Sequence, residues 1–277
     1  MIDNFLSEYI HGGKFESLAL PENRISDIGD VPDNYGEKPG IIYCPTHFYK
    51  YAFAAIDNKP GPYVLITHNS DNEVTQGMIN DKPKSIVAWF SQNVRISAPG
   101  LYPIPIGIER PHVGNSGDMG KLYSEWKNRG KRTGLLFCCF DFQTNIIERC
   151  NCYESFEHKK WCTRIGHWIP FEEHCKKLLS HRFVASPVGN GIDCIRTWEA
   201  LYLGAIPVSI KGTGLDDFCD LPILRVQNWQ SVDKRLLCEC GINNRDNNKW
   251  LKFSTWKHRI LEEAKRHGID NHQNRGE

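Results

Sequence analysis

The sequence predicts an α/β protein made of two Rossmann-like domains. Short apolar runs that end abruptly in polar residues alternate with helical patterns, which is typical of βα units. This alternation occurs twice, on either side of a polar, glycine-rich stretch at residues 110–131. The length of 277 residues accommodates two compact domains.

The strands and helix of the first half follow from apolar runs and their boundaries. We expect strands at Ile41–Cys44, Tyr63–Thr67 and Ser85–Phe90, and a helix at His47–Ile56 that a Pro-Gly-Pro sequence stops. Leu101–Ile108 is an apolar stretch that two prolines interrupt.

The second half repeats the alternation. The predicted strands are Thr133–Phe140, Arg182–Val188, Ile206–Ile210 and Pro222–Val226, and the predicted helices are Ile146–Glu157, Phe171–Leu179, Ile192–Leu203 and the amphipathic Trp250–His267. We therefore expect a first domain over 1–115 and a second over 116–249. The final helix, about 250–267, is expected to pack back on the first domain.

Composition excludes several classes of protein. Lys and Arg total 34 against 33 for Asp and Glu, so the net charge of +1 provides no basic footprint for a nucleic-acid partner. No apolar run approaches the ~20 residues of a membrane span, and the N-terminus lacks a signal-peptide pattern. The 11 cysteines include no C-x-x-C pair and several lie in apolar runs, so we expect reduced core thiols rather than disulfides or zinc. A soluble cytoplasmic protein is expected, in the host cytoplasm if the chain is viral.

The segment around Gly189-Asn190-Gly191 carries the clearest chemical pattern. Its glycines allow close approach of a ligand, and the following helix presents free N–H groups that suit a phosphate. Arg196 has the fork geometry for a diphosphate, and Glu199 can accept hydrogen bonds from ribose hydroxyls. The alternative is a tight turn followed by an ion-pair ladder of Asp193, Arg196 and Glu199 on a solvated helix.

This segment also resembles a known family. The pattern S-P-x-G-N-G-x-D-x-x-R-x-W-E-A-L-x-x-G-x-x-P-V, Ser186–Val208, is similar to the C-terminal nucleotide-sugar motif of exostosin-like glycosyltransferases. The resemblance extends to small exostosin-like enzymes of large algal viruses, among them a xylosyltransferase. It implies a GT-B fold, in which two Rossmann-like domains face each other across a cleft, with UDP-xylose or another UDP-sugar as donor. Animal members are usually longer and membrane-anchored, so their location does not carry over.

The resemblance also implies roles for individual residues. Arg196 would contact the donor phosphate and Glu199 the ribose. Weaker similarities around Thr144 place further residues near the donor. The other implied donor-site residues are Asn145, Arg149, Ser186, Asn190, Gly191 and Asp193.

The acceptor side is expected in the first domain, where a base would deprotonate the acceptor hydroxyl. His47, His68, Asp71 and Glu109 each follow a strand or apolar run. We favour His68 or Asp71, because the carboxyl ends of parallel strands face the ligand crevice. The alternatives are hydrogen-bonded loop histidines, a helix cap at Asp71 and a solvent-facing Glu109.

Asp71-Asn72-Glu73 resembles the acidic pair that holds Mn²⁺ or Mg²⁺ in other transferases. Glu73 fits that pattern loosely, and the phosphate-binding pattern lies far away in the sequence, so we expect no essential metal or cofactor.

The expected function is inverting transfer of a sugar, with xylose as the best guess, from a UDP-sugar to an oligosaccharide or glycoprotein acceptor. The alternative is a non-catalytic carbohydrate-binding protein with the same fold. A dinucleotide-dependent oxidoreductase is disfavoured, because the Gly-Asn-Gly turn does not extend to the dinucleotide-binding glycine pattern.

Overall fold

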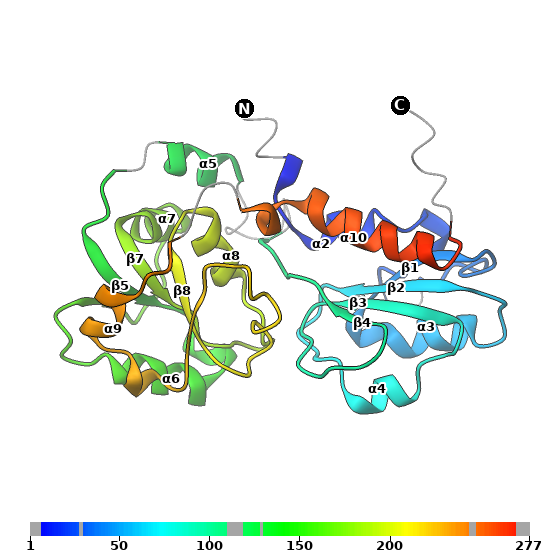
Figure 1. Ribbon diagram of the computed structural model, residues 1–277, viewed down its shortest axis with the longest axis horizontal. Helices are drawn as coiled ribbons and strands as arrows, with labels where there is room; N and C mark the ends of the chain where they lie inside the picture. Colours follow the sequence, from blue (N-terminus) through cyan, green and yellow to red (C-terminus); the bar gives the residue numbers. More distant parts are fainter. Residues whose placement is uncertain (1–6, 28–29, 110–118, 128–129, 244–247, 270–277) are drawn as a thin grey trace. The chain divides into compact units, whose positions relative to one another are not determined.

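The computed structural model describes residues 7–27, 30–109, 119–127, 130–243 and 248–269 (Figure 1). The chain divides into two compact units. The four-stranded unit takes its described residues from Ile10–Ile106 and Phe253–Glu277, and the five-stranded unit from Met1–Tyr9 and Gly107–Lys252. Each contains one parallel sheet with helices, so the predicted α/β class is confirmed and is compatible with two Rossmann-like domains. The predicted boundary at 115/116 lies outside the described residues.

The sheet of the four-stranded unit contains parallel strands in sequential order, β1-β2-β3-β4. They are Gly40–Pro45 (β1), Tyr63–His68 (β2), Ile86–Ser91 (β3) and Leu101–Pro103 (β4). Every residue of β2 is buried, as expected for a parallel strand with both faces covered. The three predicted strands are confirmed. β4 ends at the first of the two prolines that interrupt the apolar stretch.

Helices cover both faces of this sheet (Figure 1). On one face lies α3, Tyr49–Ile56, whose Phe53 ring lies 5.7 Å from that of Trp89. On the other face lie α2, Gly12–Glu16, and α10, Phe253–Arg266, which packs on β2 and β3. The remaining helical elements of the unit are η1 (Pro21–Asn23), η2 (Thr46–Phe48) and α4 (Gln76–Asn80). The predicted helix at His47–Ile56 is thus a short 3₁₀ turn followed by α3.

The start of α4 corrects one sequence-based alternative. Asp71 does not cap this helix. Thr75 is the N-cap, and its hydroxyl accepts a hydrogen bond from the Met78 amide at 3.3 Å. The carboxylate of Asp71 is therefore not used to begin a helix.

The sheet of the five-stranded unit has the order β6-β5-β7-β8-β9, and all its strand pairs are parallel. The strands are Gly134–Cys139 (β5), Cys162–Ile165 (β6), His181–Ala185 (β7), Ile206–Ile210 (β8) and Leu224–Val226 (β9). The helices are α5 (Met119–Lys127), α6 (Ile146–Ser155), α7 (Phe171–Ser180), α8 (Ile195–Tyr202) and α9 (Lys234–Glu239), with 3₁₀ turns η3 (Phe142–Thr144), η4 (Trp229–Ser231) and η5 (Lys249–Leu251). The chain adds β6 on one side of β5 and all later strands on the other, so the order reverses between β5 and β7.

Helix α8 begins later than the predicted Ile192. Cys194 is its N-cap residue with extended backbone, and the Gly189 amide donates to the Gly191 carbonyl at 3.1 Å within the preceding turn. The predicted helix start at 191–192 is therefore wrong, because the turn uses those residues. The end is as predicted: Gly204 adopts a φ of 79°, a left-handed conformation that favours glycine and ends a helix.

Candidate functional site

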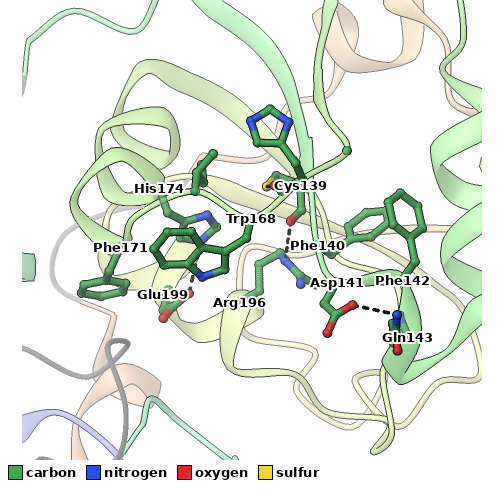
Figure 2. Close-up of a pocket in the computed structure, with 13 residues that line it drawn as sticks. Cys139, Phe140, Asp141, Phe142, Gln143, Trp168, Phe171, His174, Arg196 and Glu199 are labelled. Carbon is green, nitrogen blue, oxygen red and sulfur yellow. Dashed lines mark hydrogen bonds and ion pairs between the residues drawn. The ribbon is translucent and has the colours of Figure 1, made fainter.

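A cavity of about 670 Å³ lies in the five-stranded unit, at the carboxyl ends of β5 and β6 (Figure 2). The loops after β5 and β7 leave in different directions where the strand order reverses, and this opens a crevice at the carboxyl edge of an α/β sheet. Its walls are residues 139–143 after β5, residues 166–169 after β6, and side chains from α7 and α8. The volume is in the range of small-molecule sites.

Arg196, in the first turn of α8, reaches this cavity. Its Nε donates to the Cys139 carbonyl at 3.0 Å, and its guanidinium carbon lies 5.2 Å from the centre of the Phe140 ring. Its Nη1 is buried and has no hydrogen-bond partner among the described residues. A buried N–H group without an acceptor is costly, so this atom is suited to an acceptor atom supplied by a ligand.

Glu199 lies one turn further along α8 and also lines the cavity. Its side chain is 7% exposed, and Oε2 lies 3.3 Å from Nε2 of His174 on α7. Arg196 instead binds the end of β5, so the two side chains face one cavity but are held by different partners. The Asp193–Arg196–Glu199 ladder is therefore wrong: Asp193 precedes the helix and accepts a hydrogen bond from the Trp198 indole at 2.8 Å.

The turn before α8 is supported from behind by α6. Asn145, the N-cap of α6, donates to the Gly189 carbonyl at 3.2 Å, and buried Arg149 donates to the Val188 carbonyl at 3.2 Å and to the Asp141 carbonyl. A Cβ atom at Gly189 would lie 2.5 Å from Nη2 of Arg149, so a side chain at this position would displace the Arg149 guanidinium. Burial and the charge of Arg196 lower the pKa of Arg149. Two guanidinium groups thus lie close to one edge of the cavity, which favours an anionic ligand.

The remaining predicted donor-site residues do not line the cavity. Ser186 is buried and shares a 2.7 Å hydrogen bond with Thr197. Gly191 is buried in the turn, whereas Asn190 is exposed at its tip. Of the residues named by the pattern, the structure brings only Arg196 and Glu199 together in the cavity. Asn145, Arg149, Ser186 and Asp193 shape the segment around it.

Several cavity residues were missed by sequence reasoning. Asp141 lies two residues after β5 and directly after the predicted strand Thr133–Phe140, so a polar residue at the end of a predicted strand was the available signal. His174 lies on the predicted helix Phe171–Leu179, but nothing in the sequence links it to Glu199. Trp168 lines the cavity from the loop after β6, a strand that was not predicted, and Phe171 lines it from the first residue of α7.

The candidate bases of the four-stranded unit lie at the carboxyl edge of its sheet. His68 is 1% exposed; its Nε2 lies 3.0 Å from the Pro105 carbonyl, to which it can only donate, and its Nδ1 lies 2.8 Å from the Asn69 amide. Both ring nitrogens are occupied, so this arrangement argues against His68 as a general base. Asp71 and His47 are exposed.

The structure also describes Glu109 and the metal-like pattern that ends at Glu73. Glu109 belongs to the five-stranded unit, and not with the other acceptor-side candidates. Glu73, the second acidic residue of the metal-like pattern, forms an ion pair with Arg95 at 2.8 Å. Across the described residues no three His, Cys, Asp or Glu side chains gather in a way that could hold a metal ion. None of the helices in the described parts of the chain is long and apolar enough to span a membrane.

Comparisons with known proteins do not identify the chain: no protein-family model matches it, and no curated protein matches it.

Proposed function

We propose that the chain is a glycosyltransferase of the GT-B type that transfers a sugar from a UDP-sugar to a carbohydrate acceptor. The observation that carries this proposal is the buried, unpartnered Nη1 of Arg196 in the same cavity as the carboxylate of Glu199. A guanidinium and a carboxylate one helical turn apart suit the two polar parts of a nucleoside diphosphate, the phosphates and the ribose hydroxyls.

The position of the cavity supports the same reading. Ligands of open α/β sheets bind outside the carboxyl ends of the strands where the strand order reverses, and this cavity lies at such a point. Segment Ser186–Val208 resembles the nucleotide-sugar motif of exostosin-like enzymes, which favours a nucleotide sugar over a free nucleotide as the ligand. The same resemblance favours UDP-xylose as the donor. In this proposal the acceptor is an oligosaccharide or glycoprotein bound by the other unit.

The proposed reaction is a direct displacement with inversion. Asp71 is the proposed base, since it is exposed after β2 whereas His68 is buried and hydrogen-bonded. The base takes the proton of the acceptor hydroxyl, the acceptor oxygen bonds to the anomeric carbon, and the bond from that carbon to the diphosphate oxygen breaks. Arg196 stabilises the negative charge that develops on the leaving diphosphate.

A donor-hydrolysis and transfer assay with purified protein, UDP-xylose and a panel of oligosaccharides tests the proposal. We expect UDP release in the presence of EDTA, because Arg196 supplies the positive charge at the diphosphate. Activity that is abolished by EDTA and restored by Mn²⁺ would contradict the metal-free scheme. Glycan binding without any nucleotide binding would instead indicate a non-catalytic carbohydrate-binding protein.

A further inference from the structure

Trp168 differs from the large aromatic residues that build the two cores. Its side chain is 73% exposed, whereas Trp89, Trp198 and Trp229 are at most 1% exposed. Yet Trp168 lines the cavity that contains Arg196. An exposed indole on the wall of a partly polar cavity presents a flat apolar surface to whatever binds there.

The loop that carries Trp168 is held in place on both sides of the indole. A Cβ atom at Gly166 would lie 2.9 Å from the Tyr153 hydroxyl, so the backbone packs closely against α6. The His167 carbonyl accepts a contact of 3.9 Å from the Cys139 thiol, and Ile169 is buried. Ile169 therefore anchors the loop directly after Trp168, which limits the entropic cost of stacking on the indole.

Figure 2 shows which lining residues of the cavity lie on either side of Arg196. Trp168, Phe171 and His174 gather around Glu199. Asp141 and Gln143 lie on the other side of Arg196. Trp168 and Phe171 are thus drawn on the side of Glu199, where a ribose would be held, whereas Phe140 and Phe142 lie with Asp141 and Gln143 in the loop after β5.

We propose that Trp168 is the stacking platform for the base of the bound nucleotide. The inference rests on the proposed function, because it takes the diphosphate to be at Arg196 and the ribose at Glu199. A nucleotide in that orientation extends its base beyond the ribose, away from the loop after β5 and toward Trp168. Stacking uses the face of a base and not its edge, so Trp168 contributes affinity for the nucleoside part and none for the diphosphate.

Calorimetric titrations of the full chain with UDP, with UDP-xylose and with inorganic pyrophosphate test this assignment. Trp168→Ala is expected to weaken UDP binding about tenfold or more, in line with about 1–3 kcal/mol per stacked base. It is expected to leave pyrophosphate binding unchanged within about twofold. Trp168→Phe retains a stacking ring and is expected to restore most of the UDP affinity. Because the indole is exposed, we expect neither substitution to unfold the protein. Equal thermal unfolding midpoints of the wild type and the two variants check this.

Tyr51→Ala is the matched control, since Tyr51 is an exposed aromatic residue (51%) on α3 of the other unit. UDP binding by the wild type with an unchanged affinity in Trp168→Ala would overturn the platform and leave the proposed function standing. Equal weakening of UDP and pyrophosphate would also overturn it, because the effect would not be specific to the base. Weakening of UDP-xylose alone would place the sugar, not the base, on Trp168. No UDP binding by the wild type would instead remove the proposed function itself.

Discussion

The two parallel sheets end in different ways at their carboxyl edges. In the four-stranded sheet several polar residues there bind one another: Thr67 donates to Ser91 at 2.7 Å, and Gln92 and Asn93 both donate to the Ser70 carbonyl. The exception is the buried hydroxyl of Thr46, directly after β1, which has no hydrogen-bond partner among the described residues. In the five-stranded sheet the corresponding edge contains a cavity and a buried guanidinium nitrogen of Arg196 that has no hydrogen-bond partner in the part of the chain that the structure describes. The same βα unit thus produces a closed polar edge in one unit and an open one in the other.

Strand order explains this difference. Sequential order carries every crossover of the four-stranded sheet in the same direction, so neighbouring loops stay together and can form the hydrogen bonds from Gln92 and Asn93 to Ser70. The order β6-β5-β7-β8-β9 sends loops apart at β5, and the groups left there need a ligand. We therefore expect substitutions at the open edge to change nucleotide binding, and substitutions of the hydrogen-bonded residues Thr67 and Ser91 at the closed edge to change stability.

The largest effect is expected for Arg196→Ala. Removal of the guanidinium takes away the charge-assisted contact to the diphosphate, and UDP affinity should fall about 100-fold, or about 2.7 kcal/mol. Titration calorimetry measures this change. Arg235→Ala is the control, because Arg235 is 81% exposed in the same unit and pairs only on the surface with Glu239. An Arg196 variant that binds UDP as tightly as the Arg235 variant would break the comparison.

A smaller effect is expected for Glu199→Ala, which should weaken UDP binding about tenfold or more, or about 1.4 kcal/mol. The wild type should also prefer UDP over its 2′-deoxy analogue, and the variant should lose that preference, because the carboxylate accepts from the ribose hydroxyl. Competition titration with the two nucleotides measures both values. Glu172→Ala, on the exposed surface of α7, is the control. If the preference for UDP survives in Glu199→Ala, the ribose is held elsewhere.

At the closed edge, Thr67→Val is expected to alter stability alone. The buried hydroxyl accepts from the Trp89 indole at 2.8 Å and donates to Ser91, so its loss leaves buried polar groups without partners. The free energy of unfolding should fall by about 1–3 kcal/mol, with UDP affinity unchanged. Urea denaturation measures the former, with Ser26→Ala, an exposed hydroxyl of the same unit, as control. A loss of UDP affinity without a loss of stability would move ligand binding to this edge.

Sequence reasoning located most of the buried strands because apolar runs such as Tyr63–Thr67 and Ile206–Ile210 are long enough to identify. It missed β6 because all four residues of Cys162–Ile165 are only half-buried and include Arg164. It also began α8 too early, since the turn at Gly189–Gly191 and the helix after it share one polar pattern.

The sequence predicted which residues share the cavity only where they lie close together on one segment of the chain. Arg196 and Glu199 share a helix, so their spacing showed that they could act together. His174 and Trp168 come to the cavity from other elements, through contacts that depend on how α7 and β6 pack. His68 showed the opposite error, because its position after a strand resembled that of a base while burial and two hydrogen bonds occupy its ring.

A crystal structure of the protein with UDP tests most directly whether the nucleotide binds at Arg196 and Glu199. We expect the diphosphate oxygens to lie within hydrogen-bond distance of Nη1 of Arg196, with the ribose hydroxyls on Glu199, at the carboxyl edge of the five-stranded sheet. UDP bound at the carboxyl edge of the four-stranded sheet, or bound elsewhere with Nη1 of Arg196 still unpartnered, would contradict it.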